Sequence, residues 1–399
     1  MHCLIQSNSL LLALAACAAA CGPTVEGELG ESDTDAVTDG VDSGSTTDPE
    51  DTVDPDSDTG SPTVGTSTGE PPPTGPCGEP GSLAELWRID DPERDRGESV
   101  SVAEGRVAWV ATTWDPATRI RVHDLDGNEQ WSADALTTGG EGALRQHDIA
   151  TGSVTSFVGT DRTTGTAILQ IFDDAGQLQF ESPGISGAVD AGGTAIGPNG
   201  DVLFGGSNDD LLVDLILSGA AGSASDSYDH GGDEHVFDAT NDGADGYFVA
   251  GHSNAGGPLL ARIGPDGAIE WIVESSAEGF ETAHGVAADG AGGAWLSILP
   301  GKGSAGRLDH FGADGAFLEA IELDYGAVQV DVDANGNLVV LGRAFPDDPI
   351  LVQRITAGGD VLAETSMDGF WGLDLATDAE CHAYVSGSDE AGAFLVKLE

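Results

Sequence analysis

Three histidines stand in similar surroundings along the chain, and their side chains are the ones best suited to chemistry. They are His147, His235 and His284. Three acidic residues lie close to the latter two in sequence: Asp233, Glu234 and Glu281. Imidazole nitrogens and carboxylate oxygens could together bind a divalent metal ion or transfer protons. The alternative interpretation is that these positions merely tolerate polar side chains at a solvated rim.

Two further motifs have the residue types of a functional site. Gly251-His252-Ser253-Asn254-Ala255 resembles a nucleophile elbow, but Gly-Gly-Pro and another strand pattern follow it where the elbow requires a helix. The segment 331–337 begins like a Ca²⁺ loop, with Asp331, Asp333 and Asn335, yet Gly342 stands where the bidentate Glu is expected. We therefore interpret the first as a loop between strands and the second as a half-exposed strand entering a turn. Weak Ca²⁺ binding is expected only as a general property of the acidic surface.

The elements that must position these residues form an internal repeat. One short apolar strand pattern recurs seven times, at steps of 48, 47, 45, 47, 44 and 45 residues. Its copies are Val107–Ala111, Thr155–Gly159, Val202–Gly206, Tyr247–Gly251, Ala294–Ile298, Leu338–Gly342 and Ala383–Gly387. A further strand precedes each copy, and one or two follow it across turns such as Asp126-Gly127 and Asp266-Gly267, which favour hairpins.

Four short strands per unit of about 45 residues, without helical periodicity, are typical of a propeller blade. Seven units predict an all-β, seven-bladed β-propeller over residues 81–399. In this architecture the innermost strands start around one mouth of a central channel. His147, His235 and His284 would lie at that mouth.

The two ends of the repeat predict how the ring closes. The seventh unit stops at Glu399 after its third strand, whereas Leu83–Ile89 matches the pattern of a fourth strand. This N-terminal strand would complete the last blade and cover its open edge. Cys77 lies just before it, and Cys381 lies in a turn of the same blade, so we predict a Cys77–Cys381 disulfide in an oxidising compartment.

The first 21 residues predict an export signal. The apolar run Leu10–Ala20 is too short to cross a bilayer and ends in small residues. Leu14-Ala15-Ala16-Cys17 resembles the lipobox of bacterial lipoproteins, in which the cysteine is acylated. Cys21 is an alternative acylation site, because its use would leave an even pair of cysteines. An ordinary secreted signal peptide is the other interpretation.

Residues 22–80 contain no Lys, Arg or aromatic residue and hold 15 of the 69 acidic residues. Such a segment cannot bury enough apolar surface to fold, so we predict a disordered, extended stalk. The other 54 acids oppose all 14 basic residues, which leaves a net charge of −40 out of the chain's −55 outside the stalk. This charge excludes nucleic acid as a partner and excludes electrostatic binding to an anionic membrane surface.

The repeat units resemble those of bacterial surface lipoproteins with β-propeller repeats. The resemblance covers residues 82–399 and rests on segments such as Tyr247–Gly251 followed by Leu259–Trp271, with its Asp-Gly turn. It implies an architecture and no catalytic residues, because that class is mostly uncharacterised.

These observations together predict a monomeric, lipid-anchored module of the cell envelope that binds a protein or a glycan. The membrane would be reached through the N-terminal lipid, at the outer membrane. The alternative function is a secreted propeller enzyme, such as a metal-assisted lyase, hydrolase or lactonase, with its site at the channel mouth. The sequence leaves the cofactor open, with weakly bound Ca²⁺ as the one candidate.

Overall fold

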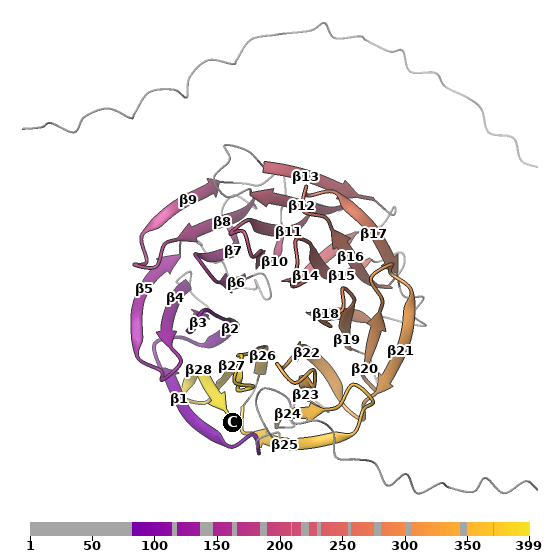
Figure 1. The fold of residues 1–399 in the computed structure, drawn as a ribbon. Coiled ribbons are helices and arrows are strands. Elements are labelled where there is room, and N and C mark those ends of the chain that lie inside the picture. Colours follow the sequence, from indigo (N-terminus) through magenta and orange to yellow (C-terminus); the bar gives the residue numbers. More distant parts are fainter. Residues whose placement is uncertain are drawn as a thin grey trace, which may run out of the picture. The chain divides into compact units, whose positions relative to one another are not determined.

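The computed structural model describes residues 82–113, 118–135, 147–161, 166–183, 190–208, 210–216, 223–229, 233–253, 257–274, 281–299, 305–343, 349–369 and 371–399. The predicted signal peptide, the predicted stalk and Cys77 lie outside the described residues. In these ranges, 28 strands form seven antiparallel four-stranded sheets arranged as a ring (Figure 1). None of the described elements is a helix long and apolar enough to span a bilayer. The predicted seven-bladed β-propeller is confirmed.

Each blade has the same strand order from the channel outward. The innermost strands are β2 (Arg96–Ala103), β6 (His147–Thr151), β10 (Asp190–Ile196), β14 (Glu234–Asn241), β18 (Thr282–Ala288), β22 (Gly326–Val332) and β26 (Trp371–Thr377). The second strands are β3 (Arg106–Thr112), β7 (Thr155–Asp161), β11 (Val202–Asn208), β15 (Tyr247–Ser253), β19 (Ala294–Leu299), β23 (Leu338–Arg343) and β27 (Ala383–Asp389). The third strands are β4 (Thr118–Asp124), β8 (Thr166–Phe172), β12 (Asp210–Ile216), β16 (Gly257–Ile263), β20 (Arg307–Phe311), β24 (Ile350–Ile355) and β28 (Gly392–Leu398). The outermost strands are β5 (Glu129–Ala135), β9 (Leu178–Pro183), β13 (Ser223–Tyr228), β17 (Ile269–Glu274), β21 (Phe317–Glu322), β25 (Val361–Met367) and β1 (Glu85–Asp91). We number the blades one to seven, starting from the blade of β2.

An aspartate organises the turn between the first two strands of the last four blades. These aspartates are Asp242, Asp289, Asp333 and Asp378. In each, Oδ1 accepts hydrogen bonds from the backbone N–H groups two and four residues later. Side-chain bonds of this kind fix a turn locally. Asp333 is therefore a turn residue, as expected, and the apparent Ca²⁺ loop is a strand that runs into this turn.

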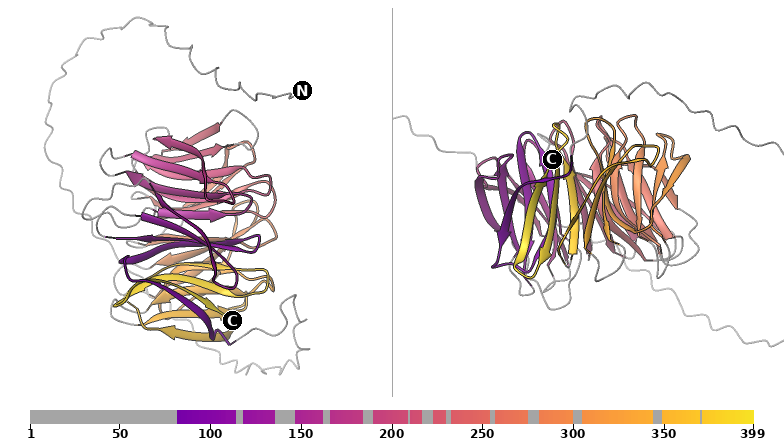
Figure 2. Two further views of the ribbon diagram at one scale, coloured as in Figure 1. Left: turned by 90° about the vertical axis from the view of Figure 1, so that its left-hand side faces the viewer. Right: turned by 90° about the horizontal axis from the view of Figure 1, so that it is seen from below.

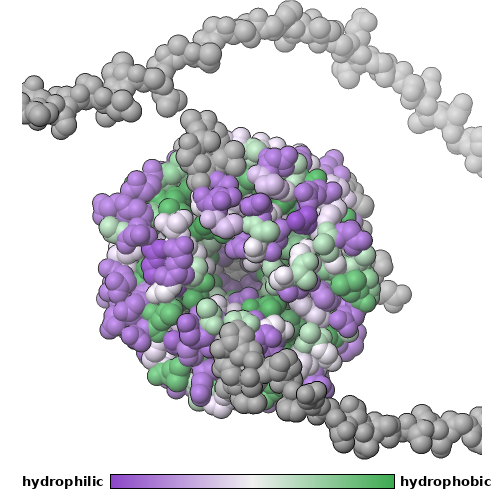
Figure 3. All heavy atoms as spheres, in the orientation of Figure 1, coloured by the Kyte–Doolittle hydropathy of each residue, from purple (hydrophilic) through white to green (hydrophobic). Residues whose placement is uncertain are grey.

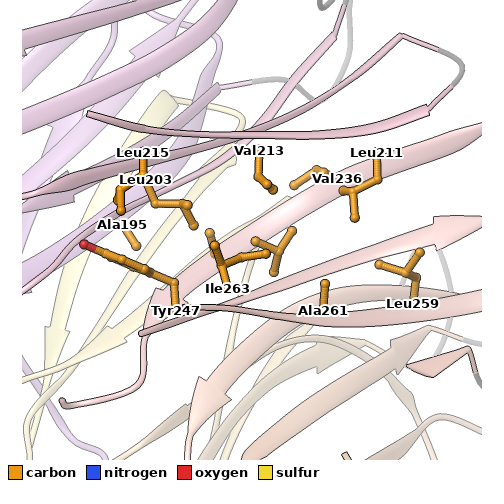
Figure 4. Close-up of a cluster of buried hydrophobic side chains, with 12 residues drawn as sticks. Ala195, Leu203, Leu211, Val213, Leu215, Val236, Tyr247, Leu259, Ala261 and Ile263 are labelled. Atoms are coloured by element: carbon orange, nitrogen blue, oxygen red, sulfur yellow. The ribbon is translucent and has the colours of Figure 1, made fainter. Parts of the chain in front are cut away.

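The apolar core is divided among the interfaces between blades. Seven clusters of buried residues occur, and each joins two neighbouring blades. Figure 4 shows the cluster between blades three and four, where Leu203 and Val213 of one blade face Val236 and Ile263 of the other. Because every interface has such a cluster, burial of apolar surface holds each blade to both of its neighbours.

The N-terminal strand β1 closes the ring by pairing with β28, as the sequence predicted. In Figure 2 the two termini of the propeller, coloured indigo and yellow, run side by side. Just before β1, Leu83 is fully buried in the cluster that joins blades six and seven. Trp87 reaches the next blade, since its Nε1 donates to the Leu125 carbonyl at 3.1 Å while its ring meets Tyr384 edge-on.

Two other outer-strand tryptophans make the same link between blades. Trp131 lies against Gly176 of the next blade's Asp-Gly-type turn, and Trp271 lies against Gly315. Trp271 also donates from Nε1 to the carbonyl of Ala313 at 3.1 Å. These tryptophans therefore pack between neighbouring blades.

We predict that Trp87→Ala lowers the free energy of unfolding by about 2–4 kcal/mol, because it removes a large side chain that joins the first and last blades. Leu86→Ala is the matched control, since Leu86 is 50% exposed on the same strand, and it should change stability by about 0.5 kcal/mol or less. Urea unfolding measures both variants. Equal effects would contradict the closure role of Trp87.

Candidate functional site

The innermost strands of the blades enclose the central channel (Figure 1). They line a cavity of about 270 Å³ with backbone and side-chain atoms from all seven blades. Figure 3 shows the ring hollowed at its centre. The cavity is the natural candidate site because concave, enclosed surfaces are where ligands are usually held.

A recurrent irregularity decides which residues face the channel. In six of the innermost strands the pairing with the second strand shifts by one residue, so one extra residue bulges out. We call the residue after the bulge the ring position. Its seven occupants, with the matching residue of β6 included, are Ser99, Asp148, Gly193, Asp238, Gly285, Gln329 and Asp374.

The three ring-position aspartates join neighbouring blades. One oxygen of Asp148 accepts from the backbone N–H of Thr194 in the next blade, at 2.7 Å. Asp238 likewise accepts from the N–H of Val286 at 2.8 Å. The other oxygen of each aspartate accepts from the next residue of its own strand, at 2.8 Å. These carboxylates therefore satisfy backbone N–H groups of the innermost strands.

Asp374 makes the same link from the last blade to the first, across the closure of the ring. Its Oδ2 accepts from the N–H of Val100 at 2.7 Å. Two residues beyond the ring position, Asp331 accepts from both the N–H and the hydroxyl of Thr377, at 2.6 and 2.9 Å. Four of the seven blade junctions thus contain an inner-strand carboxylate that bonds to the backbone of the next blade.

Asp148 and Asp374 are bridged by one hydroxyl. Ser99 Oγ lies 2.7 Å from Asp148 Oδ1 and 2.8 Å from Asp374 Oδ2. Both carboxyl groups are 8% exposed. A hydroxyl has one proton to donate, so a second proton is needed if both contacts are hydrogen bonds. The geometry therefore favours a state in which the two carboxyl groups together hold one proton.

Burial and charge also raise the pKa values of these groups. Burial, with the charge of Asp374, raises the pKa of Asp148 to about 7. Burial raises the pKa of Asp374 and that of Asp331 to about 6. The pKa of Asp238 is raised well above its ordinary value by burial and then by Asp148 and Asp374. The carboxyl groups of Asp148, Asp374 and Asp331 would therefore exchange protons near neutral pH.

The predicted histidines lie at or near the starts of their innermost strands, beside the ring positions. His147 and His284 each directly precede the ring position of their strands, and Phe237 occupies the same place in blade four. Phe237 stacks on His284 with ring centroids 4.7 Å apart, and the ring of His235 lies 6.4 Å from that of Phe237. His147 stacks instead on Phe157. Two of the three histidines, His235 and His284, thus form a row of stacked rings with Phe237, which we call the aromatic row.

The acids predicted beside these histidines have other surroundings. Glu281 forms an ion pair with Arg307 at 2.7 Å, and Asp233 is exposed. In the described ranges, only two groups of three potential ligands have donor atoms within 4.8 Å of one another. They are Asp378, Glu380 and His382, and Asp210, Asp229 and Glu234. The structure does not bring the predicted His and acid set together as one of these groups.

Three other residues singled out in the sequence are placed as follows. Ser253 ends strand β15 and donates to Glu234, and another strand follows, so its motif is not a nucleophile elbow. Cys381 is disulfide-bonded and has a φ of 65° in a turn between β26 and β27. Its predicted partner, Cys77, lies outside the described residues, so that pairing stays a prediction.

Sequence reasoning missed the ring-position aspartates. A signal for them was present, because the innermost strands contain Asp148-Ile-Ala-Thr and Asp374-Leu-Ala-Thr at equivalent places. Asp238 begins a less similar segment, Asp-Ala-Thr-Asn. Finding the pattern requires knowing where each bulge falls, which the apolar repeat alone does not define.

We predict that the protein loses stability as pH rises from about 4 to about 7, in part through Asp148. The unfolded carboxyl group releases its proton near its ordinary pKa of 3.8, whereas the folded group keeps it until about 7. The stabilisation is therefore complete below the unfolded pKa and is lost as pH passes the folded one. Asp148→Asn should reduce the difference between unfolding free energies at pH 5 and pH 8. Asp360→Asn, at an exposed position, should leave it unchanged; a D148N profile identical to the wild type would refute the assignment.

Comparison with known proteins reveals similarity of fold. No family model matches the chain, and no curated protein matches it. The WD40 β-propeller domain of Doa1 superposes with a TM-score of 0.56 at 12% identity, over 79% of this chain and 96% of that domain. A catalytically inactive virginiamycin B lyase from Staphylococcus aureus, solved with quinupristin, gives 0.57 at 12% identity, over 78% and 98%. At this identity the likeness shows a propeller fold alone.

Proposed function

We propose that this chain is a binding module of the bacterial cell envelope, held to a membrane by an N-terminal lipid. Its ligand, a protein or a glycan, would be held at the channel mouth. The apolar segment ending at Cys17 or Cys21 and the acidic segment 22–80 support the anchored arrangement. A propeller at the end of an extended stalk would be displayed away from the membrane surface.

The observation that carries the binding proposal is the aromatic row beside the ring positions of blades four and five. His235, Phe237 and His284 are all partly exposed and come from two neighbouring blades. Phe237 and His284 stack with their ring planes 8° apart, so the pair offers an outer ring face and ring edges, with polar imidazole nitrogens among them. Such a surface suits the flat face of a sugar ring or an aromatic side chain.

The channel itself is better explained by structure than by catalysis. Asp148, Asp238, Asp331 and Asp374 each accept hydrogen bonds from the backbone of a neighbouring blade. Carboxylates that hold the ring together in this way are poorly free to move toward a substrate. Among the described residues of the channel we find no nucleophile with a general base and an orienting partner.

One observation favours the alternative, a propeller enzyme. The carboxyl groups of Asp148 and Asp374, whose pKa values are raised to about 7 and about 6, line the cavity. Groups that titrate near neutral pH in a cavity are typical of active sites. Metal analysis separates the two functions, because the metal-assisted enzyme would carry a stoichiometric histidine-bound transition metal and the module would not.

The anchor is tested by fatty-acid labelling in a bacterial host. We expect the full chain to incorporate labelled fatty acid and Cys17→Ser to lose the label, because Cys17 directly follows Leu-Ala-Ala. Cys21→Ser is the matched control and should keep it. Loss of the label in Cys21→Ser alone would assign the alternative cysteine. An unlabelled wild-type chain would refute the anchor.

The ligand site is tested by capture from envelope extract on the immobilised full chain. Phe237→Ala should lose a protein or glycan that the wild type retains, because it removes the centre of the aromatic row. Phe317→Ala is the matched control, since this phenylalanine is 58% exposed on the outer strand β21. Equal retention by the two variants would place the binding surface elsewhere.

A further inference from the structure

A group of three carboxylates lies outside the channel, between blades three and four. Asp210 begins β12, Asp229 follows β13, and Glu234 begins β14. One carboxylate oxygen of each lies within 4.8 Å of the other two. Ca²⁺ binds oxygens at about 2.3–2.6 Å, so oxygens on opposite sides of one ion are about 4.6–5.2 Å apart. The spacing of the three carboxylates therefore allows all of them to contact a single ion.

Glu234 is the residue that most needs a partner. Its side chain is only 1% exposed, and Ser253 donates to its Oε1 at 3.0 Å. Its Oε2 is buried without a hydrogen-bond partner. Leaving a buried carboxylate oxygen unpaired is costly, because the oxygen has lost its water and gained nothing in return. The unpaired oxygen of Glu234 therefore indicates that a ligand binds among the three carboxylates.

The charged groups around Glu234 do not compensate the negative charge of its buried carboxylate. Burial raises the pKa of Glu234, and the carboxylates of Asp229, Asp210 and Glu274 raise it further, against the lowering effect of the Ser253 hydrogen bond. The charged groups with the largest effect on it are thus all negative. A bound cation would remove both the repulsion and the unpaired oxygen.

Apolar packing between blades three and four holds the strands that carry two of the three carboxylates. Leu211 and Val236, which follow Asp210 and Glu234 closely in sequence, are both buried in the cluster between blades three and four (Figure 4). Two of the carboxylates are therefore fixed by strands that the core holds in place. A site built on strands keeps its geometry better than one built on loops.

The other group of potential ligands provides a contrast. In Asp378, Oδ1 accepts from the N–H groups of Glu380 and His382, and Oδ2 accepts from the Tyr384 hydroxyl at 2.8 Å. The ammonium of Lys397 lies 3.9 Å away. The carboxylate of this group is already satisfied by donors and a positive charge, and it needs no metal ion.

We propose that Asp210, Asp229 and Glu234 bind one Ca²⁺ ion and so tie blade three to blade four. The ligands are all oxygens, which favours a hard cation over zinc or copper. Three carboxylates leave positions for water, and such a partial set suits Ca²⁺, which accepts irregular geometry, better than Mg²⁺, which demands a regular octahedron. Outside the channel, this ion would connect two blades whose junction lacks a ring-position carboxylate, because Gly193 occupies that place in blade three.

The test compares the full chain with Glu234→Gln, which keeps the size of the side chain and can still accept from Ser253. Calcium binding is measured by isothermal titration calorimetry, and Tm is measured with CaCl₂ and with NaCl of equal ionic strength. We expect one site in the wild type with a Kd on the order of 10⁻⁴ M, a range typical of extracellular modules, and a Tm that rises with Ca²⁺. Glu380→Gln, in the satisfied group, is the matched control and should behave as the wild type.

The expected signature is that the order of stability of the wild type and Glu234→Gln reverses when Ca²⁺ is added. Without Ca²⁺, Glu234→Gln should be at least as stable as the wild type, because it removes an uncompensated buried charge. With Ca²⁺, only the wild type and Glu380→Gln should gain stability. Equal Tm shifts in all three proteins would show general screening of the acidic surface and overturn the proposal. A Glu234→Gln protein that is less stable without Ca²⁺ would also overturn it, because Glu234 would then have a structural partner.

Discussion

Each blade of this propeller presents an unpaired strand edge to the channel, and the structure depends on how those edges are satisfied. Backbone N–H groups that find no acceptor in a narrow channel cost free energy. Here the carboxylates of Asp148, Asp238 and Asp374 accept from the N–H groups of the following blade. The same bonds that satisfy the edges therefore also connect the blades. These hydrogen bonds require acidic side chains to be buried, and burial raises the pKa values of their carboxyl groups.

The sequence predicted the architecture because the apolar repeat and its turns are local signals. The seven copies of the second strand, the Asp-Gly turns and the N-terminal closing strand were all visible as patterns, and the structure has them. The inner-strand bulges were not visible, because the register between two strands depends on how the blades meet. Residues at the ring position, such as Asp148 and Gly193, could therefore not be recognised as equivalent in advance.

In the candidate site, too, sequence patterns predicted the positions of residues along strands but not the contacts between blades. His147, His235 and His284 lie near the starts of inner strands, as expected, but Phe237 was not expected to stack on two of them. Likewise, Glu234 was noted only as a neighbour of His235 in sequence. Its burial and its approach to Asp210 follow from contact between two blades, which the spacing of residues along the chain does not describe.

The claim that channel carboxylates hold the ring by accepting backbone hydrogen bonds is tested most directly by residue-resolved amide hydrogen exchange. The amides of Val100, Thr194 and Val286 donate to these carboxylates. We predict that they exchange as slowly as amides paired between neighbouring strands, because opening them requires separation of two blades. Exchange as fast as that of exposed turn amides would contradict this account.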